Sequence, residues 1–183
     1  MSVTYYDDLV QGTEEWKEIR LKYLTGTDAY HLLRGKDIED ILEAKLVGNN
    51  FKGTRATRRG HRLEPEAVAL LEAIKEVEVH HTGFITNNKY PVVGYSPDGL
   101  IGKDGLVECK AFSKDRHLLN GKRPEVSIVA QIQWGLFVSE RQWAYLVLYN
   151  PDLDPEEAIF IIKIERNPLT MKRFENLVKG IKQ

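Results

Sequence analysis

The feature that most constrains the fold is an apolar segment that carries two opposite charges. Residues 106–112 alternate in the manner of a β-strand, so Glu108 and Lys110 point to one face while Cys109 points to the other. Apolar residues on both sides of the charged pair predict a central, covered strand. A buried carboxylate and a buried ammonium are costly to desolvate unless another group compensates them. The fold must therefore deliver a compensating charge to this strand.

A turn before the strand offers a second carboxylate. Asp98 lies in the turn sequence Ser-Pro-Asp-Gly, and a divalent cation held by Asp98 and Glu108 would compensate the buried charges. The backbone carbonyl of Cys109 would add a third oxygen ligand. Lys110 would then orient or deprotonate an attacking water. Two simpler interpretations stand beside this one: Asp98 as an ordinary turn residue, and the Glu108–Lys110 pair at an exposed sheet edge.

The remaining pattern predicts helices in the first part of the chain and mostly strands after them. Thr13 and Asp37 are candidate N-caps of two helices, and the turn at residues 25–28 precedes the start of another. Pro65 predicts the start or a kink of another helix, with Glu64 near its N-terminus or bend. Strands at residues 77–86, 91–95, 100–101 and 106–112 follow, and we expect them to form a meander. The later elements are a helix at 126–137, strands at 143–149 and 158–164, and a helix from 167 onward. This order predicts an α/β fold with a mixed central sheet flanked by helices, as a single domain over residues 1–183.

Composition narrows the classes of function. The hydrophobic fraction of 42% and the charged fraction of 29% are ordinary for a globular protein. The single cysteine excludes an internal disulfide, a zinc ribbon and a cysteine-ligated iron–sulfur cluster. The sequence has neither a membrane-length apolar run nor the apolar core of a signal peptide, so we expect a cytoplasmic protein without a membrane partner.

A local basic cluster contrasts with the formal net charge of -1. The stretch between residues 52 and 62 contains no acidic side chain and carries the basic residues Lys52, Arg55, Arg58, Arg59 and Arg62. Such a cluster is a candidate footprint for nucleic-acid phosphates. The alternative interpretation is a solvated helix face.

The residues of the charged strand and the turn also resemble a known motif. Pro97-Asp98 followed by Glu108-x-Lys110 resembles the PD-(D/E)xK nuclease signature. More narrowly, the chain is similar to the lambda-type phage exonucleases, also called YqaJ-like viral recombinase nucleases. Four segments carry this resemblance in the family's order: Arg20 to Asp28 (R-x6-S/T), Gly60 to Pro65 (G-x-x-x-E-P/N), Ser96 to Gly99 (S-P-D-G) and Ala130 to Trp134 (A-Q-V/I-Q).

The resemblance implies a restriction-endonuclease-like core and a complete metal site. Asp98 and Glu108 would bind the metal, and Glu64 would complete the site directly or through a water. The implied cofactor is Mg²⁺, as a pair of ions for which Mn²⁺ can substitute. Gln131 would position Lys110 or the nucleophile. A solvent-facing position on an amphipathic helix is the simpler interpretation of Gln131 alone.

The same resemblance assigns the phosphate contacts. Arg20 and Thr27 would contact phosphate near the scissile bond or at the 5′ end of the DNA, because an arginine fork suits a phosphate and a hydroxyl adds a donor. Thr27 stands where the family commonly has serine, which keeps the hydroxyl. Taken alone, Arg20 is most simply a surface charge and Thr27 a helix N-cap.

The implied function is an exonuclease that degrades the 5′-ended strand of linear duplex DNA and leaves 3′ overhangs for recombination. The implied partners are double-stranded DNA ends, a single-strand annealing protein and two further copies of the chain in a homotrimer. Two alternatives remain at this stage. One is an endonuclease on the same fold, and the other is a non-catalytic DNA-binding module.

Overall fold

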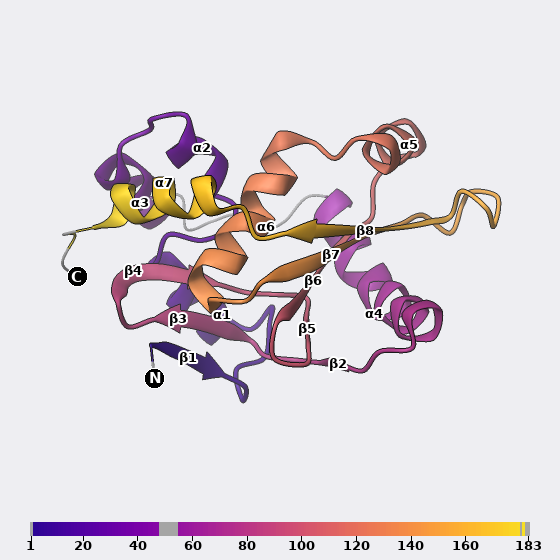
Figure 1. Ribbon diagram of the computed structural model, residues 1–183, viewed down its shortest axis with the longest axis horizontal. Coiled ribbons are helices and arrows are strands. Elements are labelled where there is room, and N and C mark those ends of the chain that lie inside the picture. Colours follow the sequence, from indigo (N-terminus) through magenta and orange to yellow (C-terminus); the bar gives the residue numbers. More distant parts are fainter. Residues whose placement is uncertain (1, 48–54, 180, 182–183) are drawn as a thin grey trace.

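The strands form two sheets, and helices cover them on the outside (Figure 1). The computed structural model describes residues 2–47, 55–179 and 181. In chain order the elements are β1 (Val3–Tyr6), α1 (Glu14–Leu21), α2 (Ala29–Leu33), α3 (Ile38–Val47), α4 (Arg55–Lys75), β2 (Val79–His80), β3 (Phe84–Asn87), β4 (Tyr90–Tyr95), β5 (Gly99–Ile101), β6 (Gly105–Lys110), α5 (Lys114–Lys122), α6 (Val126–Ser139), β7 (Trp143–Tyr149), β8 (Ile159–Glu165) and α7 (Pro168–Val178).

The larger sheet is mixed, and its strand order is β2-β5-β6-β7-β8. Strands β6 and β7 run parallel, in a register that pairs Glu108 with Leu146, and the other neighbours run antiparallel. A parallel pair needs a crossover connection, which α5 and α6 provide here. In this strand order β6 is the central strand of the sheet, as the apolar flanks of Glu108 and Lys110 predict.

A smaller antiparallel sheet has the strand order β1-β3-β4. The prediction of one continuous meander from residue 77 to residue 112 is therefore wrong, because β3 and β4 leave the sheet that holds β2, β5 and β6. Alternation predicts which face a side chain takes, but it does not say which strand is the neighbour. The short segment 96–98 joins the two sheets and contains Asp98.

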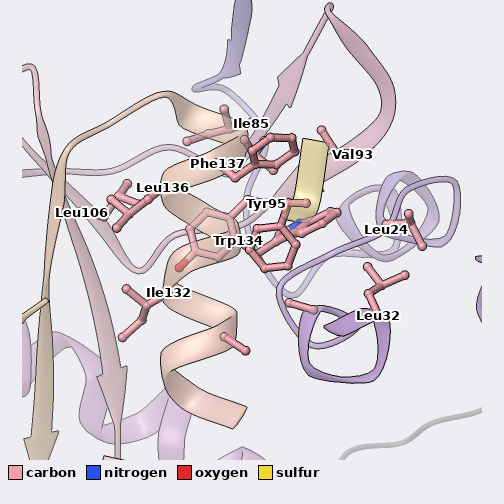
Figure 2. Close-up of a cluster of buried hydrophobic side chains, with 14 of the residues drawn as sticks. Leu24, Leu32, Ile85, Val93, Tyr95, Leu106, Ile132, Trp134, Leu136 and Phe137 are labelled. Carbon is pink, nitrogen blue, oxygen red and sulfur yellow. The ribbon is translucent and has the colours of Figure 1, made fainter. Parts of the chain in front are cut away.

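Two hydrophobic clusters lie on the two sides of the larger sheet. In the first, α6 packs against both sheets and against α7, and the ring centroids of Trp134, Phe137 and Phe174 lie within 6 Å of one another. Figure 2 shows Trp134 and Phe137 of this cluster. In the second, α4 covers β6 and β7, and the buried Leu71 belongs to the same cluster as Val107. Strand β6 is thus covered on both faces.

Several helix signals are confirmed. The Thr13 hydroxyl accepts from the backbone N–H of Trp16 at the start of α1, and Asn167 caps α7 in the same way. Asp37 accepts from the N–H of Glu39 at the start of α3. Strand β1 and helix α5 were not predicted. No described helix is both long enough and apolar enough to cross a membrane.

The sequence predicts either a helix start or a kink at Pro65, and the start is wrong. Helix α4 runs from Arg55 to Lys75 with Pro65 inside it. An interior proline loses one backbone hydrogen bond and costs about 3 kcal/mol. The buried stripe of Leu63, Ala67 and Leu71 continues across the proline, so the burial of this face outweighs that cost.

Candidate active site

Glu108 is the centre of a buried polar network. Only 2% of the residue is exposed, although it carries a carboxylate. Its Oε2 atom accepts a hydrogen bond from the hydroxyl of Tyr95. Its Oε1 atom accepts from the Lys110 ammonium and from the amide nitrogen of Gln131. The two carboxylate oxygens together accept from three donors on three different elements, so the buried charge has the hydrogen bonds that it needs.

Lys110 extends from the same face of β6 as Glu108, as the strand alternation predicts. Burial by itself lowers the pKa of Lys110, but the carboxylates of Glu108 and Asp98 more than offset this and raise its pKa above the ordinary value. Lys110 is consequently a charged donor in this arrangement rather than a free base.

Asp98 is fixed by its turn. Its Oδ2 atom accepts from the backbone N–H of Cys109 at 2.6 Å, and the side chain of Gln11 holds the Pro97 carbonyl at 2.7 Å. Burial raises the pKa of Asp98 well above its usual range, and the nearby carboxylates of Glu108 and Glu64 raise it further. The carboxylates repel one another, and that repulsion is the electrostatic problem that a bound cation solves.

Glu64 reaches the site from the middle of α4. Burial and the Glu108 carboxylate raise its pKa, while Lys110 opposes the shift. Glu64, Asp98, Cys109 and Lys110 line one open cavity of about 280 Å³. Helix α4 thus delivers the carboxylate that the sequence places before Pro65, but from a helix interior rather than from a helix start.

The carboxylate set fits a divalent cation. No group of three His, Cys, Asp or Glu side chains within residues 2–47, 55–179 and 181 is close enough to enclose a metal ion by itself. Magnesium does not need such a cage, because it takes one or two protein carboxylates and fills its shell with water and phosphate. Asp98 and Glu108, whose carboxylates are close enough for Glu108 to raise the pKa of Asp98, form an oxygen set of that kind, and oxygen is the ligand that Mg²⁺ and Mn²⁺ prefer.

Lys110 also lines a second cavity, of about 200 Å³. Lys110, Phe112 and Arg116 line both cavities. The second cavity also contains Thr27 and Gln131. The structure therefore places these two sequence-predicted residues around a cavity that Lys110 also lines, and Gln131, which donates to Glu108, is not a solvent-facing helix residue.

Arg20 is held against the same turn as Asp98. The Ser96 hydroxyl accepts from Arg20 at 3.1 Å and from the indole nitrogen of Trp16 at 2.9 Å. The guanidinium lies over the Trp16 ring, 4.3 Å from its centroid. Burial lowers the pKa of Arg20, and the carboxylates of Asp28, Glu108 and Asp98 oppose this shift. Arg20 is therefore a half-buried part of the site rather than a surface charge.

The basic segment divides into parts with different surroundings. Arg59 donates to the Phe112 carbonyl at 3.2 Å, to Asn150 at 2.8 Å and to Asp152 at 2.7 Å, so it ties α4 to the ends of β6 and β7. Arg55, Arg58 and Arg62 are exposed on the first half of α4. Lys52 lies outside the described residues.

Three residues at the site were not predicted from the sequence. Tyr95 contacts Glu108, Ser96 contacts Arg20, and Arg116 lies between the two cavities. Ser96 belongs to the Ser-Pro-Asp-Gly turn motif, and its place two residues before Asp98 is a signal that could have predicted its position at the site. Arg116 lies on the unpredicted α5, and Tyr95 has the pattern of a core residue, so neither carried a signal.

Comparisons with known proteins agree on one family. The profile of the YqaJ-like viral recombinase domain matches residues 15–142. An alkaline exonuclease, LHK-Exo from Laribacter hongkongensis, is similar with a TM-score of 0.82 and 27% identity over 92% of this chain and 90% of that chain. Its complex with dAMP is similar with the same TM-score and 28% identity. A phage-related exonuclease from Haemophilus somnus 129PT shares the fold, with a TM-score of 0.64 and 13% identity over 88% and 92% of the two chains. No curated protein sequence matches the chain.

Proposed function

From the premise that this chain belongs to the YqaJ-like viral recombinase family, we propose that it is a metal-dependent exonuclease acting on the ends of double-stranded DNA. The chain is a nuclease with a PD-(D/E)xK-type fold. The observation that carries the finer proposal is the convergence of Glu64, Asp98 and Glu108 with Lys110, from α4, a turn and β6.

Asp98, Glu108 and the Cys109 carbonyl would hold a divalent cation, with Glu64 as an additional ligand. We propose Mg²⁺ as a pair of ions, with Mn²⁺ as a substitute. When bound, the cation supplies positive charge against the negative charge that develops on a phosphate during hydrolysis. The Glu108 carboxylate raises the pKa of both Glu64 and Asp98, and the negative charge of this set would attract such a cation.

Lys110 would orient the attacking water and stabilise the developing negative charge, because its ammonium is a donor at the boundary of both cavities. Gln131 would fix the direction of that ammonium through their shared contact with Glu108 Oε1. Arg20 and Thr27 would contact phosphate near the scissile bond or at the 5′ end of the DNA. The exposed arginines of α4, with Lys52, would contact the duplex backbone.

We propose 5′→3′ digestion that leaves 3′ overhangs for single-strand annealing, with an annealing protein as partner and a homotrimer as the assembly. The support is family membership and the similarity to an alkaline exonuclease over nine-tenths of both chains. An endonuclease on the same fold is the alternative, since the catalytic carboxylates alone do not distinguish ends from interior bonds.

The test is time-resolved digestion of linear duplexes labelled at either the 5′ or the 3′ end, with Mg²⁺ and with EDTA. We expect Mg²⁺-dependent release that begins at the 5′ label and leaves a covalently closed circle intact. Release that begins at the 3′ label would reverse the polarity. Rapid cutting of the circle would replace the exonuclease by the endonuclease.

An Asp98→Ala variant separates catalysis from binding. Mg²⁺-dependent digestion should fall by at least about a hundredfold, while the protein still binds duplex DNA. Digestion at the native rate would exclude Asp98 from the site. Loss of digestion in the native protein under all metal conditions would favour a non-catalytic DNA-binding module.

A further inference from the structure

Tyr95 is a buried residue whose hydroxyl reaches the active site. It ends β4 in the smaller sheet, and only 1% of the residue is exposed. Its hydroxyl donates to Glu108 Oε2 on β6 of the larger sheet. This hydrogen bond therefore crosses from one sheet to the other at the carboxylate that the proposed function places on the metal.

Two glycines make room for the Tyr95 ring. A Cβ atom added at Gly135 of α6 would lie 2.5 Å from two atoms of the ring, and one added at Gly26 would lie 3.1 Å from a third. Contacts below 3.0 Å are essentially never seen for real Cβ atoms. The ring is thus enclosed between α6 and the turn before α2. In Figure 2 it lies beside α6 with its hydroxyl directed away from the Trp134 and Phe137 rings.

The enclosed ring fixes one edge of the Glu108 carboxylate. Tyr95 donates to Oε2, while Lys110 and Gln131 donate to Oε1. Rotation of the carboxylate plane about its last single bond would break these hydrogen bonds. A residue with a locked ring is suited to prevent that rotation, since outer hydrogen bonds set the orientation of metal-binding carboxylates.

We propose that Tyr95 is a positioning residue of the nuclease, whose hydroxyl holds Glu108 in the orientation that serves the cation and Lys110. The proposal rests on the proposed function. A residue needed only for packing would not require the hydroxyl, because phenylalanine has the same ring and fills the same space between Gly26 and Gly135.

The chain offers a matched control. Tyr90 lies on the same strand, is 8% exposed, and donates its hydroxyl to Glu175 of α7 at 2.7 Å. The change Tyr90→Phe removes the same group from a tyrosine–carboxylate pair in the core cluster that holds α7. It therefore reproduces the loss of a hydrogen bond without touching Glu108.

The experiment compares Tyr95→Phe with Tyr90→Phe and the native protein. Digestion of a linear duplex gives kcat and KM, and calorimetry gives the affinity of the DNA-free protein for Mn²⁺. For Tyr95→Phe we expect kcat to fall about 10- to 100-fold with KM within about twofold, and the Mn²⁺ affinity to fall about tenfold or more. Tyr90→Phe should keep all three values within about twofold of native.

A second variant, Gly135→Ala, keeps the hydroxyl but pushes the ring, and it should give the same pattern as Tyr95→Phe. Native kcat and native Mn²⁺ affinity in folded Tyr95→Phe and Gly135→Ala would overturn the proposal. A failure of both variants to fold would also overturn it, because the role of Tyr95 would then be structural. If the native protein itself shows no metal-dependent digestion, the proposed function fails instead, which is a distinct result.

Discussion

At the residue scale, the charge of Asp98 lowers the stability of the cation-free protein, although the proposed chemistry needs that charge. Burial and two carboxylates raise its folded-state pKa. Its contribution to stability is therefore fully present below the unfolded pKa and is lost as the pH rises through the folded pKa. Asp98→Asn keeps an acceptor for the Cys109 N–H but removes the charge. We expect a higher free energy of unfolding than native in EDTA at neutral pH, together with at least about a hundredfold loss of nuclease activity.

Urea unfolding of both proteins in EDTA at several pH values checks this prediction. The stability difference should shrink as the pH falls below the ordinary carboxyl range, because Asp98 of the native protein is then protonated. A neutral-pH free energy of unfolding lower than native would mean that the Asp98 charge is already compensated without a cation.

Sequence alone predicted the residue contacts that are local and missed those between distant segments. Glu108 and Lys110 share a face because a strand alternates, and the contact follows from two positions in one element. The Tyr95–Glu108 and Arg20–Ser96 hydrogen bonds depend on how separate elements dock. The family resemblance, rather than the residue pattern, suggested that Gln131 and Arg20 approach the charged strand.

At the element scale, Pro65 makes α4 less stable than a helix of the same length without an interior proline. Pro65→Ala restores a backbone N–H inside the helix and removes the clash with the preceding turn. We expect the free energy of unfolding to rise by about 1–3 kcal/mol, measured by urea unfolding. Pro168→Ala is the control, because proline in the first turn of α7 loses no hydrogen bond. An equal gain in both variants would show that the interior position of Pro65 is not the cause.

The start of α6 carries a pH-sensitive contact. Arg116 donates two hydrogen bonds to Glu125, at 2.7 and 2.8 Å, and lowers the pKa of Glu125 to about 2. A depressed carboxyl pKa stabilises the fold above the unfolded value near 4.5, and the stability is lost as the pH falls toward 2.

Glu125→Gln tests this contact. Because the Glu125 side chain is 38% exposed, solvent screening limits the loss of unfolding free energy at pH 7 to about 1 kcal/mol. The native and variant free energies, measured by urea unfolding from pH 7 to acid, should converge near pH 2. A constant difference over that range would assign the effect to packing or to the hydrogen bond with Asn120 rather than to charge.

Element prediction succeeded where the hydrophobic period was strong. Helices α6 and α7 and strands β7 and β8 follow their apolar patterns closely. Helix α5 has only two buried residues, His117 and Asn120, and both are polar, so no apolar stripe announces it. Strand β1 has only four residues and no fully buried side chain, which leaves no signal apart from its pairing with β3.

At the scale of the whole molecule, the exposed arginines of α4 make a prediction about DNA affinity. We expect Arg55→Glu with Arg62→Glu to weaken duplex binding and to reduce the slope of log affinity against log salt by about 0.9 per lost phosphate contact. Lys172→Glu is the control, because it is exposed on α7, away from α4 (Figure 1). Titrations at several salt concentrations measure both. An unchanged slope in the α4 variant would make this face a solvated surface only.

The division into two sheets was not predictable, whereas the mixed α/β class was. Each strand has a recognisable pattern, but the partner of β4 depends on packing against α6, which joins segments far apart in the chain. The similarity to solved exonucleases concerns this whole arrangement rather than any single element.

The parallel pairing of β6 with β7 has a consequence for the order of folding. Lys110 pairs with Leu148 only after the crossover through α5 and α6 has closed, and such long-range closure is slow. Tyr95 can reach Glu108 only when the smaller sheet has docked as well. A chain that is still folding thus lacks an assembled active site, so its nuclease activity should return in the slowest refolding phase. The topology therefore allows cleavage only after the β6–β7 pairing has formed and the smaller sheet has docked.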